Sequence, residues 1–124
     1  SMIIEQIKVA VIELVHREAN DIKIKHSEYL SRHLNYEYPY LSKLFSDEEG
    51  VTIEQFIIQQ KTEKIKELIA YGELNFSEIA WQMGYSSVAA LSSQFKKVMG
   101  ITPSEYKAAH SNDRKSLDKV AKVI

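Results

Sequence analysis

Apolar residues recur along the chain at steps of three and four positions, which is the period of an α-helix and not that of a strand. The first apolar stripe consists of Ile3, Ile4, Ile7, Val11, Leu14 and Val15. This stripe predicts an amphipathic helix over about residues 3–18 with one buried face. Since only four glycines and two prolines interrupt the chain, the predicted fold class is all-α.

Two short helices with a turn between them are predicted next. Ser27 is the expected N-cap of the first short helix, and residues 35–37 form the turn. The apolar positions of the two helices are Leu30, Leu34, Leu41, Leu44 and Phe45. Gly50 ends the second helix, because glycine readily adopts the left-handed conformation that closes a helix.

Capping patterns mark the beginnings of the helices that follow. Thr52 and Gln55 form a capping box, which predicts a long helix over about residues 52–71. Asn75 and Glu78 repeat the pattern and open another short helix, whose buried positions are Ile79, Ala80 and Met83.

The last predicted helices follow the same logic. Ser86 or Ser87 caps a helix that ends before Gly100. Its inward positions are Leu91, Phe95 and Val98. Residues 102–105 then open a final helix with proline at its first position, so about seven helices are predicted in all. Residues 108–124 are compatible with either a weak amphipathic helix or a frayed tail.

A shift of the sequence by fifty positions superposes two copies of one pattern. The matched pairs are Leu41 with Leu91, Ser42 with Ser92, Phe45 with Phe95, Gly50 with Gly100, Val51 with Ile101, Thr52 with Thr102, Gln55 with Glu105 and Phe56 with Tyr106. Each copy contains a short helix, a turn and a second helix, which are the dimensions of a helix-turn-helix. The predicted organisation is one helix-turn-helix over about residues 1–50, a linker helix over 52–71, a second helix-turn-helix over 75–107 and a tail over 108–124.

Two stretches of the second copy, IAWQMGYSS at 79–87 and LSSQFKKVMGITPSEY at 91–106, resemble the signature of the AraC/XylS family of bacterial transcription regulators. Residues 40–50 are similar to that family's first recognition helix, and residues 56–69 to its connecting helix. The resemblance covers roughly residues 27–107. It implies a DNA-binding domain with two homeodomain-like lobes, whose second helices read two successive major-groove segments of double-stranded DNA.

The resemblance also implies which side chains face the bases. The positions carried over to the two second helices are Tyr38, Pro39, Ser42 and Lys43, and Val88, Ala89, Ser92 and Ser93. A single phosphate site is predicted from Ser86, Ser87, Lys96 and Lys97, because helix N-termini and ammonium groups favour anions. A solvated helix face is the alternative for these lysines. For Tyr38, one of several tyrosines at the first turn, packing against neighbouring helices is the favoured alternative.

The charge of the chain departs from what DNA binding usually requires, since phosphate contacts need basic side chains. Sixteen basic and 17 acidic residues give a formal charge of −1, and the stretch 26–110 holds eight basic and eleven acidic residues. Acidic residues at 47–49 and serine at 93 occupy positions where family members often carry basic residues. We therefore expect the first copy to bind DNA weakly and the second to make few direct base contacts.

Several other function classes find no support in the residues. The chain has no cysteine, and His16, His26, His33 and His110 lack the spacing of metal ligands. No nucleophile, phosphate loop or metal cluster accompanies the carboxylates, so we expect no enzyme activity, no metal and no cofactor. The absence of a long apolar run and of a signal-peptide pattern predicts a cytoplasmic protein that does not enter the membrane.

Two interpretations of function therefore remain. The first is a sequence-specific DNA-binding regulator of transcription, for which the resemblance implies a separate sensing or dimerisation domain and allows RNA polymerase as a further partner. The alternative is a protein-interaction module on the same fold with weak or lost DNA binding.

Overall fold

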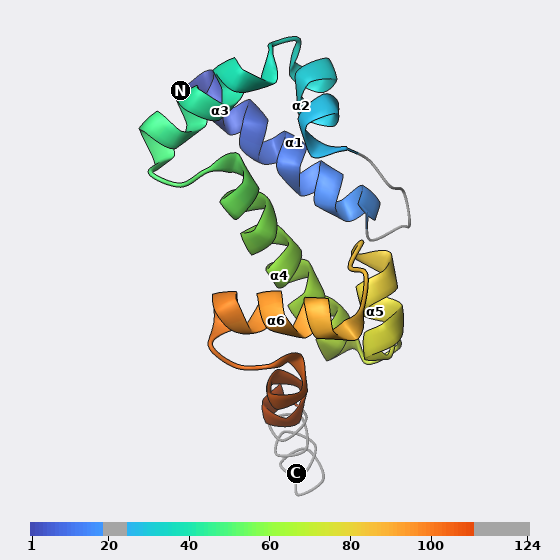
Figure 1. Cartoon of the computed structure of the whole chain (residues 1–124). Helices are drawn as coiled ribbons and strands as arrows, with labels where there is room; N and C mark the ends of the chain where they lie inside the picture. Colours follow the sequence, from blue (N-terminus) through green and yellow to red (C-terminus); the bar gives the residue numbers. More distant parts are fainter. Residues whose placement is uncertain (19–24, 111–124) are drawn as a thin grey trace, which may run out of the picture. The chain divides into compact units, whose positions relative to one another are not determined.

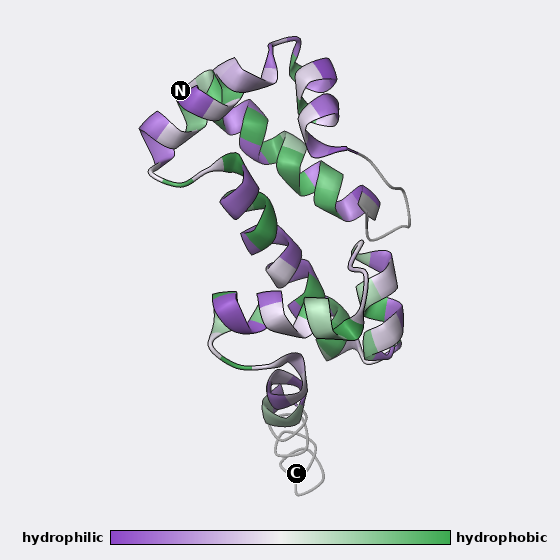
Figure 2. Ribbon diagram, viewed as in Figure 1, coloured by the Kyte–Doolittle hydropathy of each residue, from purple (hydrophilic) through white to green (hydrophobic). Residues whose placement is uncertain are grey.

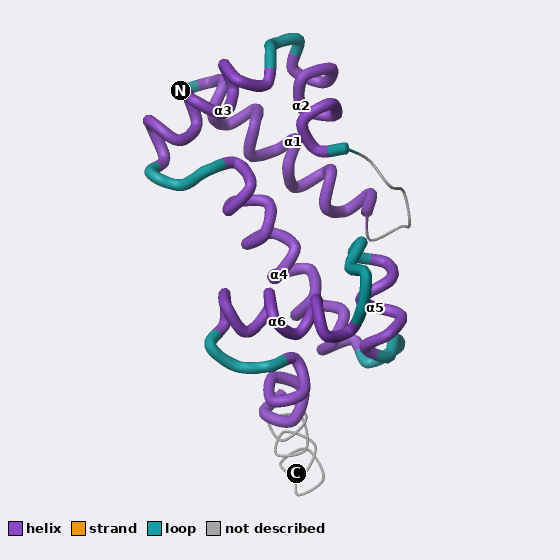
Figure 3. Tube along the Cα trace, viewed as in Figure 1, coloured by secondary structure: helices purple, strands orange, loops and turns teal. Residues whose placement is uncertain are grey.

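The computed structural model describes residues 1–18 and 25–110, which form helices joined by short loops (Figure 1). The labelled helices are α1 (Met2–Glu18), α2 (His26–Leu34), α3 (Tyr38–Glu49), α4 (Ile53–Tyr71), α5 (Phe76–Gln82) and α6 (Val88–Met99). Residues 103–110 are also helical, so the described residues contain seven helical segments and no strand (Figure 3). The predicted all-α class is confirmed.

The chain divides into two compact units. Among the described residues, the first unit comprises residues up to 64 together with residues 82–84, and the second comprises residues 65–81 and 85–110. Helix α4 contributes residues to both units. Of the predicted tail, residues 108–110 are helical, and residues 111–124 lie outside the described part of the chain.

Helix α1 supplies one side of the core of the first unit. Its buried residues are Ile4, Ile7, Ala10, Val11, Leu14 and Val15. Figure 2 shows hydrophobic residues gathered along this helix. Helix α1 contacts both α2 and α3, from which Leu30, Leu41 and Phe45 are buried. Burial of apolar surface therefore ties α3, the second helix of the first copy, to two neighbouring helices.

The second unit has its own apolar core. The buried residues are Ile65 and Ile69 of α4, Ile79 and Ala80 of α5, Leu91 and Phe95 of α6, and Pro103. Ala80 has a small side chain, which favours a close approach of neighbouring helices. Lys107 places its ammonium nitrogen 5.5 Å from the ring centroid of Phe76, within the range of a cation–π interaction.

The offset of fifty residues holds in three dimensions. Helices α3 and α6 each contain 12 residues, and their first residues are Tyr38 and Val88. Both end at a glycine in the left-handed conformation, Gly50 with φ of 75° and Gly100 with φ of 80°. A side chain at either position would be strained whatever space surrounds it, so the glycine that closes each copy has a conformational reason.

The aromatic contacts of the two copies also correspond. The rings of Phe45 and Phe56 lie 5.5 Å apart in the first copy, and those of Phe95 and Tyr106 lie 5.8 Å apart in the second. Both phenylalanines are buried, with exposed fractions of 0% and 1%. Each pair joins the second helix of a helix-turn-helix to the helix that follows it.

The predicted capping boxes form as reciprocal hydrogen bonds. The amide of Thr52 donates to Gln55 Oε1 over 2.9 Å, and the amide of Gln55 donates to Thr52 Oγ1 over 3.0 Å. Asn75 with Glu78, and Thr102 with Glu105, form the same pair of bonds. These contacts satisfy amides that an α-helix cannot satisfy internally, so they fix where α4, α5 and the final helix begin.

Two local predictions were wrong. Helix α2 begins at His26 after Lys25, without a side-chain cap, so Ser27 lies inside the helix and does not cap it. Val98 was expected to point inward and is 41% exposed. Val98 lies in the last turn of α6, beyond Leu91 and Phe95, where the apolar period continues but the core does not.

A tyrosine hydrogen bond connects the beginning of α3 to α4. The hydroxyl of Tyr38 donates a hydrogen bond to Oε1 of Glu54, in the first turn of α4. Burial, together with this bond, raises the pKa of the Tyr38 phenol above its ordinary value. The packing alternative for Tyr38 thus agrees with its half-buried position, and its hydroxyl has a partner within the protein.

We expect Phe95→Ala to lower the free energy of unfolding by about 3–5 kcal/mol, because the substitution removes buried apolar atoms and leaves a cavity beside Tyr106. Urea unfolding followed by circular dichroism measures the loss. Val98→Ala on the same helix is the control, since Val98 is exposed, and we expect a change within about 0.5 kcal/mol. A loss below about 1 kcal/mol for Phe95→Ala would contradict the packing described.

Tyr38→Phe should lower stability at neutral pH by about 0.5–1.5 kcal/mol, since it removes the hydroxyl that Glu54 accepts. Tyr40→Phe is the control, because Tyr40 is 49% exposed and its ring stacks on that of Tyr36. The unfolded chain releases the Tyr38 proton near pH 10, before the folded chain does, so the Tyr38 contribution should decrease as pH rises above about 10. Equal stabilities of the two variants at pH 7 would contradict this role.

Candidate nucleic-acid interface

The predicted base-facing residues of the first copy lie in the first half of α3. A helix turns by about 100° per residue, so Pro39, Ser42 and Lys43 share one face. Pro39 and Lys43 are exposed and Ser42 is half-buried, whereas Leu41 and Phe45 on the opposite side are buried. Tyr38 differs from the other three, because its side chain is directed to Glu54 of α4.

Lys43 forms an ion pair on this exposed face. Its ammonium nitrogen lies 3.0 Å from Oδ2 of Asp47, one turn further along α3, and the two side chains are 79% and 62% exposed. Exposed pairs at this spacing contribute only about 0.3–0.5 kcal/mol. Lys43 can therefore exchange Asp47 for another anion at little cost, but together the two side chains carry no net charge.

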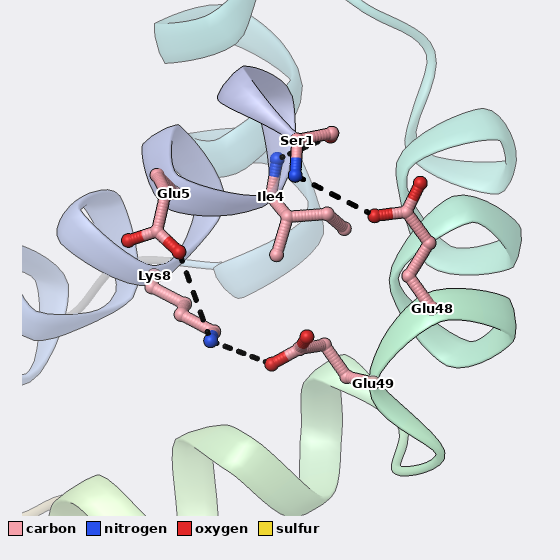
Figure 4. A network of polar contacts seen from close by, with 6 residues as sticks. All are labelled: Ser1, Ile4, Glu5, Lys8, Glu48 and Glu49. Carbon is pink, nitrogen blue, oxygen red and sulfur yellow. Dashed lines mark hydrogen bonds and ion pairs between the residues drawn. The ribbon is translucent and has the colours of Figure 1, made fainter.

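The other acidic residues at the end of α3 are directed to α1, as Figure 4 shows. Oε1 of Glu49 lies 2.6 Å from Nζ of Lys8, which also lies 3.9 Å from Oε1 of Glu5. The hydrogen bond with Glu49 raises the pKa of the Lys8 ammonium group. Glu48 lies 3.9 Å from the nitrogen of Ser1. Of the three consecutive carboxylates, only Asp47 therefore pairs with a residue of the candidate reading face.

The second candidate set lies on α6. Ser87 is the N-cap of this helix, and its Oγ accepts a hydrogen bond of 3.0 Å from the amide of Ala90. Ser86, Ser87, Val88 and Ala89 are exposed at the helix start. The first amides of a helix point out of its N-terminus and favour an anion there, which is compatible with the phosphate contact predicted for Ser86 and Ser87.

Most of the remaining residues predicted to contact DNA lie on one side of α6. Ala89, Ser92, Ser93 and Lys96 occupy positions at steps of three and four, so they follow one another along a single face. Ser93 and Lys96 are exposed, and Ser92 is half-buried. Lys97 is exposed and adjoins this face. The face presents small uncharged side chains first and two cations at its end.

The four residues predicted to form one phosphate site lie at the two ends of α6. Ser87 caps the N-terminus of α6, whereas Lys96 and Lys97 lie in its last turn. At a rise of about 1.5 Å per residue, Ser87 and Lys96 are about 14 Å apart along the helix axis. The sequence places these residues close in number, but the helix separates them into two groups.

The lysines at the end of α6 also have a structural effect. Cations in the last turn of a helix complement the negative end of its dipole. Hydrogen bonding to the backbone amide and the side chain of Thr102 lowers the pKa of the Glu105 carboxyl group, and the charge of Lys96 adds to this lowering. In contrast, the last turn of α3 contains no basic residue.

Two features of the second unit were not selected from the sequence. The hydroxyl of Tyr85 donates to Oε1 of Gln94, which joins the turn before α6 to the helix itself. No spacing rule identifies that contact. Trp81 of α5 is 60% exposed, and its position directly after the buried pair Ile79 and Ala80 could have identified it as an outward residue. Within residues 1–18 and 25–110, no cluster of histidine and carboxylate side chains could hold a metal ion.

No described helix is suited to span a membrane. None combines the length and the apolar character that crossing a bilayer requires.

Comparisons with known proteins agree with this geometry. A family model described as "Helix-turn-helix domain" matches residues 30–109. The Msm operon regulatory protein of Streptococcus mutans is 28% identical over 99 residues, which cover 73% of this chain and 36% of that protein. The chain thus spans about a third of that relative and a smaller share of several others, including 12% of the regulator YtdP of Bacillus subtilis.

Solved structures give the same result. The C-terminal domain of AraT, a response regulator from Geobacillus stearothermophilus, has a TM-score of 0.72 and 28% identity, covering 88% of this chain and 86% of that one. The DNA-binding domain of AdpA, solved with a target DNA, has a TM-score of 0.73 over 90% of this chain and 96% of that one. At 20% identity, the AdpA similarity shows the fold alone. The chain belongs to the AraC-type helix-turn-helix family of transcription regulators.

Proposed function

We propose that this domain binds double-stranded DNA with α3 and α6, each in one of two successive major-groove segments. The observation that carries the proposal is the correspondence between the two helices. Each follows a turn after a shorter helix, has the same length and keeps one side of its first half exposed. A helix exposed along one side and anchored along the other has the form that major-groove reading requires.

The roles of individual residues follow from their chemistry. Pro39, Ser42 and Lys43 on α3 are proposed base-facing residues, while Tyr38 orients the helix through Glu54. On α6 the proposed base-facing residues are Val88, Ala89, Ser92 and Ser93. Methyl groups of valine and alanine suit contact with the methyl group of thymine, and serine hydroxyls bond to bases with little discrimination.

Phosphate contacts are proposed at both ends of α6. Ser86 and Ser87 supply the helix N-terminus at one end, and Lys96 and Lys97 supply cations at the other. A separation of about 14 Å along the helix suits two contacts with the backbone on either side of a groove about 12 Å wide. Such contacts position the domain and carry no base information.

The functional division of the chain is part of the proposal. We propose a first helix-turn-helix over about residues 1–50, a linker helix over 52–71 and a second helix-turn-helix over 75–107. A separate sensing or dimerisation domain and RNA polymerase are the proposed partners of the full regulator, with the cytoplasm as its location. The chain covers only part of its longer relatives, so the proposals about partners and location rest on membership of the family.

A protein-interaction module is the second candidate function. The observation that favours it is charge: residues 26–110 carry eight basic and eleven acidic side chains. Domains that bind DNA normally carry an excess of basic residues on the binding face. The two candidates differ in whether charge changes on α3 and α6 alter the affinity for DNA.

We expect Lys97→Ala to weaken binding to all duplexes by a similar factor and to reduce the slope of log affinity against log salt by about 1, because a phosphate contact acts on every sequence. Fluorescence anisotropy at several salt concentrations measures both quantities. Lys97→Arg keeps the charge and should bind within about threefold of the wild type. A changed sequence preference with an unchanged slope would show that Lys97 reads bases.

Charge reversal at Lys43 tests the contribution of the first copy. Lys43→Glu should lower the affinity for a duplex selected by the wild-type protein more than about tenfold at moderate salt, since it places repulsive charge beside Asp47. Lys43→Arg should preserve binding. Melting temperatures of both variants are measured first, so that unfolding is excluded. Unchanged affinity of Lys43→Glu would remove α3 from the DNA interface and favour the interaction module for that half.

A further inference from the structure

The two copies differ in charge at equivalent positions. With the offset of fifty, Asp47 of α3 corresponds to Lys97 of α6. Each lies three residues before the glycine that ends its helix. Lys97 is exposed and lies beside Ser93, whereas Asp47 is exposed and holds Lys43, the equivalent of Ser93. The position that adds a cation to the second copy thus neutralises one in the first.

Helix stability gains little from an acid at position 47. Carboxylates in the last turns of a helix are opposed by the negative end of the dipole, and the last turn of α3 contains no basic residue that compensates them. An i,i+4 pair is also more favourable when the acidic residue precedes the lysine. Lys43 and Asp47 have the reverse order.

Packing does not explain Asp47 either. Glu49 is bonded to Lys8 and Glu48 faces Ser1, so these two carboxylates serve the contact of α3 with α1 (Figure 4). The Asp47 side chain is 62% exposed and its ion pair is with Lys43, on the face that contains Pro39 and Ser42. Asp47 therefore belongs to the face with which α3 is proposed to bind DNA.

We propose that Asp47 is a specificity-determining residue, whose negative charge cancels that of Lys43 and thereby lowers the attraction of the α3 face for DNA of unrelated sequence. A free lysine binds any phosphate, so it strengthens binding to every duplex alike. With Lys43 neutralised, the first copy gains affinity only where contacts with the bases or the shape of the DNA add to it. The second copy, with Lys96 and Lys97, supplies the sequence-independent attraction. This inference rests on the DNA binding proposed above.

Asp47→Asn tests the inference, because it removes the acceptor charge and keeps the size of the side chain. The matched control is Glu28→Gln on α2, which breaks another exposed pair at the same spacing, with 2.9 Å between Arg32 Nη2 and Glu28 Oε1. Both variants lose one negative charge and release one cation. They differ in whether that cation lies on the α3 face.

Affinities are measured by fluorescence anisotropy for a duplex selected by the wild-type protein from random sequences and for a mixed-sequence duplex of the same length. We expect Asp47→Asn to bind the mixed-sequence duplex about three- to tenfold more tightly, with a salt slope steeper by about 0.9. The ratio of selected to mixed-sequence affinity should fall at least about threefold. Asp47→Lys places at position 47 the residue type found at position 97, and should enlarge the changes in mixed-sequence affinity and in the ratio. The affinities of Glu28→Gln should stay within about twofold of those of the wild type.

The possible outcomes separate this inference from the proposed function. If the wild type binds the selected duplex and Asp47→Asn leaves affinity, slope and ratio unchanged, the role of Asp47 is refuted and DNA binding stands. An equal effect of Glu28→Gln would show that net charge alone acts, and would also refute that role. If neither wild type nor variants bind any duplex, both the proposed function and the inference fail. Melting temperatures verify that all variants are folded.

Discussion

Each half of this domain depends on one buried aromatic contact. Phe45 packs against Phe56, and Phe95 against Tyr106, so that the second helix of each helix-turn-helix is anchored to the helix that follows it. The contact fixes which side of α3 and α6 is buried, and therefore which side remains exposed. Since a side chain rotates by about 100° for each step along a helix, anchoring one phenylalanine decides the direction of every residue on its helix.

The parts surrounding this contact hold it in register. A left-handed glycine ends each second helix five residues after the phenylalanine, and a threonine two residues later begins the next helix with a reciprocal capping box. The loop between these two fixed points is short, and the second aromatic ring packs against the first. Stability and orientation thus have the same origin, and changes in the loop would affect both.

Electrostatics distinguishes the two halves where packing makes them alike. Lys96 and Lys97 give the end of α6 a positive charge, whereas the corresponding end of α3 carries serine and aspartate. Because Glu49 is paired with Lys8 of α1, the acidic end of α3 is less repulsive to phosphate than its sequence suggests. An almost neutral chain can therefore present a local positive region, and net charge alone is a poor guide to its partner.

The sequence by itself determined the helices, their caps and the repeat. The three- and four-residue period, the capping boxes and the glycines are local signals, each complete within a few residues, so they identify α3, α4 and α6 without tertiary information. The local pattern misled where it continued past the core, as at Val98, and where a helix began before the residue expected to cap it, as at Ser27.

Only the tertiary structure decided what each charged or polar side chain contacts. The bond from Tyr38 to Glu54 and the pair of Lys8 with Glu49 join residues 16 and 41 positions apart, and no period in the sequence records them. The distance between Ser87 and Lys97 likewise follows from a helix axis and not from their numbering. Local spacing determines secondary structure because its hydrogen bonds are local, whereas the environment of a charge depends on which helices pack together.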